Sequence, residues 1–311
     1  MKMSVSVKKV ATLTGHSSSI YALSASGPNT FFSGSGDKIV AEWDLQNPGE
    51  GVLLAKIPEI VYSLFTDLKN DRLLVGQAHG GIHVISLSER NELRLLQNHS
   101  APIFHIGSSP KHNLLFSLAG DGKLGILDSN TLGLNAQLII GDGKLRTSAV
   151  NADETLLAIG SADGYITVFS LPELAPVKRW QAHQEGFSVN ALVFSPDGKL
   201  LLSGSRDALL NVFAVADDFN LVQSIPAHNY AIYSIAYSPD NKLLATGSRD
   251  KTIKIWNPET FEFLHRIDNE KEEGHKNSVN KIIWHNQSGH LISGSDDRAI
   301  MIWRIEMISD K

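Results

Sequence analysis

An aspartate, replaced once by a histidine, recurs seven times along this 311-residue chain at nearly constant intervals. The intervals are 42, 42, 42, 44, 43 and 47 residues, and six residues after each recurrence comes an aromatic or large apolar residue. The recurring positions are Asp37, His79, Asp121, Asp163, Asp207, Asp250 and Asp297, and they are followed by Trp43, Ile85, Leu127, Phe169, Phe213, Trp256 and Trp303. A period of about 42 residues predicts a repeat protein whose units bury their apolar faces against one another.

The unit at 227–257 shows the internal pattern most clearly. Its three strand-length runs are Ile232–Tyr237, Leu243–Thr246 and Thr252–Trp256, and they are separated by Ser-Pro-Asp-Asn-Lys and Ser-Arg-Asp-Lys. Such short runs between turn residues predict a three-stranded antiparallel meander. The segments between units supply candidates for a fourth strand: Lys8–Leu13, Val52–Ile57, Glu92–Gln97, Leu134–Ile140, Ala175–Gln181, Leu221–Ile225 and Glu262–Ile267.

Four strands in each unit of about 42 residues are typical of a propeller. We therefore predict an all-β fold, a seven-bladed β-propeller of four-stranded antiparallel blades. The N-terminal strand is expected to close the last blade, which removes an open sheet edge, and Arg304–Lys311 is expected to be a short tail. The prediction is a single domain over 1–311, with repeat units near 8–45, 46–87, 88–129, 130–171, 172–215, 216–258 and 259–305.

Two segments carry a resemblance to a known family. Thr14-Gly15-His16, followed by Trp43-Asp44, and Gly274-His275, followed by Trp303, resemble the Gly-His…Trp-Asp signature of WD40 repeats. The resemblance implies buried structural tetrads in which Asp accepts from the imidazole, a hydroxyl bonds the other ring nitrogen, and the indole N–H bonds the hydroxyl. The tetrads of blades 1, 6 and 7 are His16, Ser33, Asp37 and Trp43; His228, Thr246, Asp250 and Trp256; and His275, Ser293, Asp297 and Trp303.

The other four blades depart from the tetrad. Blades 3 and 5 keep the histidine, serine and aspartate but have Leu127 and Phe213 in place of tryptophan. Blade 4 keeps only Asp163, and blade 2 keeps no member. We predict that blades 2 and 4 are held by apolar packing alone. His83 is interpreted as an isolated histidine.

The bulk properties exclude several classes of protein. The net charge is −5, from 28 basic and 33 acidic residues, which argues against a general attraction to nucleic acid or to anionic lipid. Without cysteine the chain has no disulfide or thiolate site. No signal-peptide core follows Met1–Lys9, and no apolar run reaches the ~20 residues that span a membrane. We expect a cytoplasmic protein that binds neither nucleic acid nor membranes and whose propeller is monomeric.

No motif for catalysis or for metal or nucleotide binding was found. The chain lacks H-E-x-x-H, G-x-S-x-G and a P-loop, and the histidines outside the tetrads do not have zinc-site spacing. The aspartates recur once per unit, as a structural role predicts. The prediction is that the protein is not an enzyme and needs no metal or cofactor.

Loops on a rigid scaffold are where binding residues concentrate. In WD40 proteins the usual binding face carries the His-containing loops and the Asp turns, and the resemblance implies the same top face here. Three positions per blade lie on it: five after the tetrad histidine, three after it, and just before the tetrad aspartate. The predicted partner-binding residues are Tyr21, Tyr62, Phe104, Lys144, Arg146, Asn190, Arg206, Tyr233, Arg249, Asn280 and Asp296.

These residues place aromatic side chains in blades 1 to 3 and basic ones in blades 4 to 6. Tyrosine and arginine are enriched in interface hot spots. The insertion Asp268–Glu273 enters blade 7 on the same face and is interpreted as a solvated acidic loop, or else as a selector of charge. We predict a non-enzymatic scaffold that binds a protein or peptide, and a segment with an acidic group and an apolar anchor would suit it. The alternative is an enzyme or small-ligand binder that uses the central channel.

Overall fold

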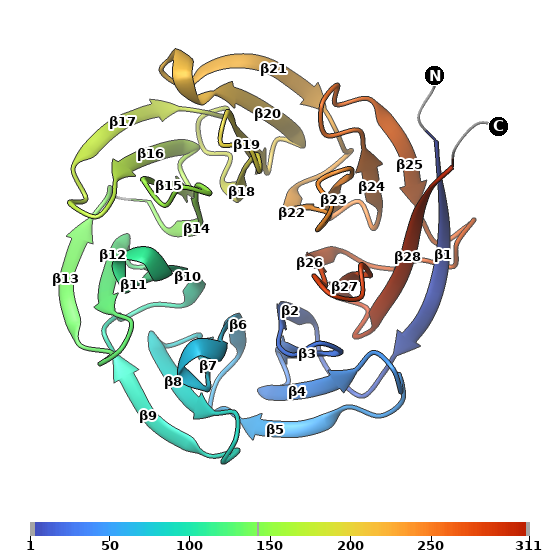
Figure 1. The fold of residues 1–311 in the computed structure, drawn as a ribbon, viewed down its shortest axis with the longest axis horizontal. Helices are drawn as coiled ribbons and strands as arrows, with labels where there is room; N and C mark the ends of the chain where they lie inside the picture. Colours follow the sequence, from blue (N-terminus) through green and yellow to red (C-terminus); the bar gives the residue numbers. More distant parts are fainter. Residues whose placement is uncertain (1–3, 142, 309–311) are drawn as a thin grey trace. The chain divides into compact units, whose positions relative to one another are not determined.

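The computed structural model describes residues 4–141 and 143–308. Within these ranges the chain forms seven four-stranded antiparallel sheets, the seven blades of the predicted β-propeller (Figure 1). The helical segments of the same ranges are three 3-10 turns, and none of them is long enough to cross a membrane. They are η1 (Leu68–Asn70), η2 (Pro110–His112) and η3 (Val215–Asp217).

The chain divides into two compact units, 1–58 with 233–311, and 59–232. The first contains blades 1, 6 and 7. Blade 1 is β2 (Ile20–Ala25), β3 (Thr30–Ser35), β4 (Ile39–Asp44) and β5 (Val52–Lys56); blade 6 is β22 (Ile232–Tyr237), β23 (Leu244–Ser248), β24 (Ile253–Trp256) and β25 (Phe263–Ile267). Blade 7 is β26 (Val279–Trp284), β27 (Leu291–Ser295), β28 (Ile300–Ile308) and β1 (Ser4–Leu13).

The second unit contains blades 2 to 5, whose innermost strands lie side by side in chain order (Figure 1). Blade 2 is β6 (Val61–Asp67), β7 (Arg72–Gln77), β8 (Gly81–Ser86) and β9 (Glu92–Gln97); blade 3 is β10 (Ile103–Ser109), β11 (Leu114–Ala119), β12 (Lys123–Asp128) and β13 (Leu134–Ile139). Blade 4 is β14 (Leu145–Val150), β15 (Leu156–Ser161), β16 (Tyr165–Ser170) and β17 (Pro176–Gln181); blade 5 is β18 (Val189–Phe194), β19 (Leu200–Ser205), β20 (Leu209–Ala214) and β21 (Asn220–Pro226).

The N-terminal strand closes the last blade, as predicted. β1 pairs with β28 from Ser4 opposite Ile308 to Leu13 opposite Ile300. The prediction of a tail after Trp303 is wrong for 304–308, because β1 begins at Ser4 and provides a partner for that length of β28. The rest of the predicted tail, 309–311, lies outside the described residues.

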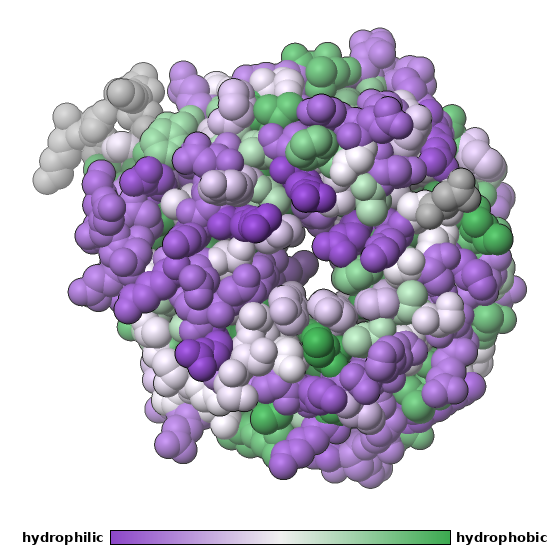
Figure 2. Space-filling view, turned by 180° about the vertical axis from the view of Figure 1, so that it is seen from behind, coloured by the Kyte–Doolittle hydropathy of each residue, from purple (hydrophilic) through white to green (hydrophobic). Residues whose placement is uncertain are grey.

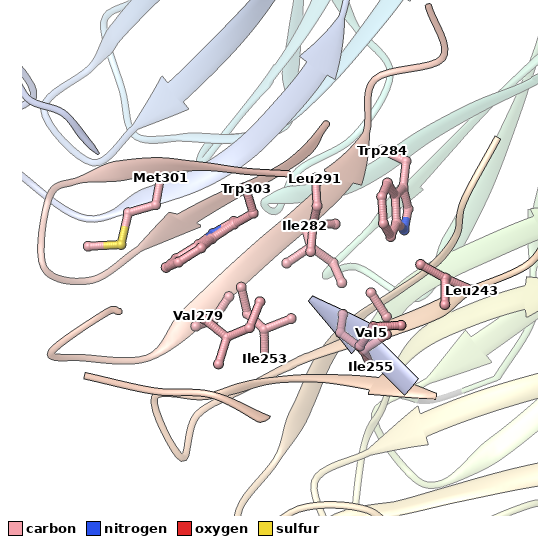
Figure 3. Packing of buried hydrophobic residues seen from close by; sticks show 12 residues of the cluster. Val5, Leu243, Ile253, Ile255, Val279, Ile282, Trp284, Leu291, Met301 and Trp303 are labelled. Atoms are coloured by element: carbon pink, nitrogen blue, oxygen red, sulfur yellow. The ribbon is translucent and has the colours of Figure 1, made fainter. Parts of the chain in front are cut away.

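The core of each blade comes from its central strands, because these are covered on both faces. β7 and β8 are buried at every position, whereas the outer strand β9 is exposed at all but one. Figure 3 shows one such core, in which Trp303 and Leu291 of blade 7 pack with Ile253 of blade 6 and Val5 of β1. Strands that are covered on both faces have continuous runs of apolar residues in their sequences. These runs make the repeat easy to recognise in the sequence.

Two complete tetrads are hydrogen-bonded as predicted. In blade 7, His275 Nδ1 lies 2.9 Å from Asp297 Oδ2, and His275 Nε2 lies 2.8 Å from Ser293 Oγ. The indole N–H of Trp303 donates to the same Ser293 Oγ at 3.0 Å. Blade 1 repeats this arrangement with corresponding distances of 2.9, 2.7 and 2.7 Å between His16, Ser33, Asp37 and Trp43.

Blades 6, 3 and 5 show the rest of the pattern. In blade 6 Trp256 donates to Thr246 Oγ1 at 2.9 Å, and His228 is buried. Blades 3 and 5 keep the bonds from histidine to aspartate and serine. In blade 5 the apolar ring that replaces the tryptophan, Phe213, packs edge-on against Trp180 of blade 4, with ring centroids 5.4 Å apart.

The prediction that blade 2 is held by apolar packing alone is wrong. His83, buried in β8, lies 2.9 Å from Glu92 and 3.1 Å from Gln77 through its two ring nitrogens. This histidine is therefore not isolated, and it ties β7, β8 and β9 together. Buried Arg72 adds a link to blade 3, because it donates to Asp67 at 2.9 Å and to the carbonyl oxygen of Ser129.

The same prediction is wrong for blade 4. Asp163 accepts from Ser161 Oγ and lies 3.3 Å from the guanidinium of Arg179, so its carboxylate is held without a histidine. At the other end of the blade, Glu154 Oε2 accepts from Ser109 Oγ of blade 3 at 2.6 Å. A buried acceptor needs a donor, but the donor need not come from the tetrad.

The tetrads predict a large stability effect for Asp297→Ala. The change leaves the buried His275 ring without its acidic partner and removes the acceptor for the Lys276 and Ala299 N–H groups. We expect a loss of about 3–5 kcal/mol in the free energy of unfolding, measured by urea titration. Asp163→Ala, at the same turn of blade 4 but without a histidine partner, is the control. An equal loss in both variants would contradict a special role for the tetrad.

Asp297 is expected to make the free energy of unfolding decrease as the pH falls. Burial alone would raise the pKa of Asp297, but the hydrogen bond and charge of His275, with the Lys276 and Ala299 N–H groups, lower it from 3.8 to about 2. A carboxyl with a lowered pKa in the folded state stabilises the fold above its unfolded pKa. This contribution is lost as pH falls from 3.8 to about 2. Urea midpoints across this window should fall less steeply for Asp297→Asn than for the wild type.

Candidate functional site

The predicted partner-binding residues of the inner strands lie at β-bulges. The pairing of six inner strands, β2, β6, β10, β14, β18 and β26, skips one residue near the strand's start, between Ile103 and His105 in blade 3, for example. A bulge leaves one residue unpaired and redirects its side chain. The skipped residues are Tyr21, Tyr62, Phe104, Arg146, Asn190 and Asn280, and Tyr233 holds the same sequence position in β22.

A main-chain hydrogen bond holds each bulge against the Asp turn. In blade 3 the N–H of Gly120 donates to the carbonyl of Pro102 at 2.9 Å, and in blade 7 Asp296 donates to Ser278 at 3.0 Å. The donor is the residue before the recurring aspartate, and the acceptor lies two residues before the bulge. The three sequence positions predicted to share a face therefore meet at one end of the blade.

Three of the predicted residues form one stack in the second unit. The rings of Tyr62 and Phe104 lie 5.5 Å apart at a tilt of 60°, and the guanidinium of Arg146 lies 4.2 Å from the Phe104 ring centroid. They come from β6, β10 and β14, the inner strands of three successive blades. We call Tyr62, Phe104 and Arg146 the aromatic–arginine stack. A cation over a ring face is attracted by the ring quadrupole, so the stack holds Arg146 in place.

Glycine at position 120 makes room for this stack. A Cβ atom there would lie 3.3 Å from the Phe104 ring and 3.3 Å from both Ala101 and Pro102, which is tighter than nearly all Cβ contacts. The position before the aspartate is therefore restricted by the ring above it.

Two predicted binding residues instead connect neighbouring blades. The Asn280 amide donates to the Ile20 carbonyl at 3.0 Å and to Asp296 at 2.7 Å. Asn190 donates to the Ile232 carbonyl at 3.2 Å and lies 2.7 Å from Ser188 Oγ. Amides committed to carbonyls of the next inner strand position the blades, so we give these two residues, and Asp296, less weight as contacts for a partner.

The predicted basic residues Lys144, Arg206 and Arg249 are exposed. Lys144 is exposed two residues before Arg146, and Arg206 is exposed at the corresponding turn of blade 5. Arg249 is exposed at the same turn of blade 6, and Tyr21 and Tyr233 are half-buried. The face seen in Figure 2 is hydrophilic over most of its area, with its hydrophobic residues in small groups. Recognition on such a surface depends on individual side chains rather than on one apolar patch.

The insertion Asp268–Glu273 is a turn that is exposed at four of its six residues, as a solvated loop would be, but its acidic side chains are partly paired. Asp268 is buried and accepts from the N–H groups of Glu270 and Lys271, while Glu272 pairs with His265 at 2.8 Å. Glu273 pairs with Lys9 of β1 at 2.8 Å. Glu272 and Glu273 are thus paired with basic side chains of β25 and β1.

The sequence analysis missed Lys281, the residue after the Asn280 bulge. It is half-buried in β26, and burial lowers the pKa of its ammonium group. The sequence could have indicated it, because Lys281 directly follows Asn280, one of the positions predicted to bind a partner. In 4–141 and 143–308 no group of three or more His, Cys, Asp or Glu side chains is placed to hold a metal ion.

Comparison with known proteins supports the repeat assignment. The WD40 family pattern, described as "WD domain, G-beta repeat", matches residues 7–44, 174–213, 219–257 and 268–304. These segments include the tetrad tryptophans of blades 1, 6 and 7.

Curated relatives share part of the chain. Protein HIR1 of Eremothecium gossypii is 28% identical over 54% of this chain and 23% of its own length. Meiotic fizzy-related protein 1 of Schizosaccharomyces pombe is 28% identical over 66% of this chain and 49% of its own length. Human apoptotic protease-activating factor 1 is 36% identical over 56% of this chain and 14% of its own length. The chain therefore spans less than half the length of these relatives.

A solved structure matches almost the whole fold. The WD40 β-propeller domain of Doa1 has a TM-score of 0.84 and covers 96% of this chain and 97% of that chain. At 19% identity this likeness concerns the fold alone. The four WD40 repeat matches, together with the seven four-stranded blades, show that this chain belongs to the WD40-repeat β-propeller family.

Proposed function

We propose that this protein is a non-enzymatic scaffold that binds a segment of a partner protein at the bulge ends of blades 2 to 5. The observation that carries the proposal is the aromatic–arginine stack with exposed Lys144 beside it. The family and the relatives support a protein-interaction scaffold or regulator in general. The bulge residues are where this chain differs from one blade to the next.

The chemistry of the stack indicates the kind of segment it would bind. Tyr62 and Phe104 offer half-buried ring surface to an apolar side chain, and both residue types contribute strongly at interfaces. Arg146 and Lys144 offer cationic groups to a carboxylate or a phosphate. We infer a segment with an apolar anchor and an acidic group a few residues away, bound without chemical change.

Phe104→Ala should weaken partner binding strongly. The change removes the ring that contacts both other members of the stack, and loss of a hot spot of this kind costs about 2 kcal/mol or more, roughly 30-fold in affinity. The partner is first captured from native lysate, and its affinity for the purified variants is then measured by calorimetry. Phe263→Ala, a half-exposed phenylalanine on the outer strand β25, is the control. Equal affinity of both variants would remove the stack from the binding site.

Lys144→Glu with Arg206→Glu should slow association with the same partner. Exposed charges steer encounter, so the association rate should drop at low salt and the difference should shrink as salt is added. Lys199→Glu with Lys242→Glu makes the same change in net charge at exposed turns on the other ends of blades 5 and 6. Stopped-flow rates that fall equally in both pairs would show an effect of net charge alone. In that case the acidic half of the inferred segment is wrong.

A further inference from the structure

The outer strands of the blades differ in how their unpaired edges are protected. An exposed strand edge invites pairing with another chain, and charged residues or proline normally prevent it. Six of the seven outer strands carry such protection: Lys8 and Lys9 in β1, Lys56 in β5, Glu92 and Arg94 in β9, Pro176, Lys178 and Arg179 in β17, Pro226 in β21, and Arg266 in β25. Among the described strands, β13 has neither.

β13 is the outer strand of blade 3, where it pairs with β12 on one side only (Figure 1). Its sequence is Leu-Asn-Ala-Gln-Leu-Ile, and Ile139 is 76% exposed, more than any other large hydrophobic side chain of the described residues. The N–H of the next residue, Ile140, donates to the carbonyl of Gly122, just before β12. Because successive residues point their main-chain groups to opposite edges, those of Ile139 and Gln137 face the unpaired edge.

Both ends of β13 are flanked by arginines from the neighbouring blades. Arg94 of β9 donates to the carbonyl of Thr131, in the turn before β13, at 3.4 Å. Arg179 of β17 donates to the carbonyl of Ile140, just after it. Lys123 of β12 lies directly opposite Ile139.

Two described acidic side chains near these ends, Asp163 and Asp128, already have partners. Asp163 lies 3.3 Å from Arg179, and Asp128 accepts the N–H groups of Asn130 and Thr131 in its own turn. In the described residues β13 itself carries no charged side chain, and Arg94 and Lys123 place basic groups near its two ends.

We propose that the edge of β13 is a docking site for an extended segment of another protein, which adds to blade 3 as a fifth strand. Main-chain hydrogen bonds to Gln137 and Ile139 would supply affinity, and alternate apolar side chains would cover Ile139. The basic ends select acidic residues that flank the segment. This surface is separate from the bulge positions, and the proposal does not depend on them.

A second copy of this chain fits the same edge less well. Two β13 strands paired antiparallel about a two-fold axis would set the start of one beside the end of the other. Arg94 of one copy would then approach Lys123 of the other, and like charges at an interface oppose association. The charges favour an acidic segment over self-pairing.

The test uses a fluorescein-labelled peptide with two aspartates at each end and alternating valine and threonine between them, and fluorescence anisotropy as the readout. We expect saturable binding to the full chain. Ile139→Pro removes one outward donor without breaking the pairing with β12, and Ile139→Glu places an acidic charge beside the aspartates of the peptide; each should weaken binding at least tenfold. Val222→Glu, the matching change at an exposed position of β21, should leave binding unchanged. Circular dichroism confirms that each variant is folded.

Other results would overturn the proposal. No binding of the aspartate peptide by the wild type would do so, as would equal weakening by Val222→Glu. Equal affinity for a peptide with lysines in place of the aspartates would show that the flanking arginines select nothing. A concentration-dependent dimer in sedimentation experiments, abolished by Ile139→Pro, would identify the second copy as the occupant instead.

Discussion

Each typical blade of this propeller depends on one carboxylate at the turn between its second and third strands. In blade 7, Asp297 accepts from the ring of His275 and from the main-chain N–H groups of Lys276 and Ala299. It thereby joins the incoming loop to the turn, and the serine–tryptophan pair extends the connection to the middle of the sheet. A network of this kind is favourable because all its polar members find partners away from water.

Blades 2 and 4 show that the fold requires satisfied polar groups rather than a particular tetrad. Blade 2 replaces the tetrad with a histidine on a different strand, His83, between Glu92 and Gln77. Blade 4 holds its aspartate with Ser161 and Arg179. Both blades are also hydrogen-bonded to blade 3, blade 2 through Arg72 and blade 4 through Glu154. These bonds add stability to the blades that lack the tetrad.

The same turn geometry creates the variable surface. The main-chain bond behind each Asp turn fixes the position of a bulge, and the bulge directs one side chain away from the sheet. The scaffold therefore repeats while the bulge residue is free to change. In blades 2, 3 and 4 this produces a stack of two aromatic rings and an arginine, and in blades 5 and 7 it produces asparagines that connect the blades.

The sequence by itself determined the number of blades, the four-stranded unit, the closure by the N-terminal strand and the tetrads of blades 1 and 7. These features repeat, so seven copies reinforce one weak local signal. The sequence also predicted which positions share one end of a blade, because register is preserved from unit to unit. Interactions that occur in only one blade could not be predicted from the sequence. One example is the pairing of His83 in β8 with Glu92 in β9.

Only the tertiary structure decided which of the predicted site residues have side chains available for binding a partner. Asn280 and Phe104 hold the same register, yet one hydrogen-bonds the next blade and the other stacks with Tyr62 and Arg146. That choice depends on what the adjacent inner strand places opposite each side chain, about 40 residues away in the chain. The unprotected edge of β13 likewise became visible only when its flanking arginines were placed by the blades on either side.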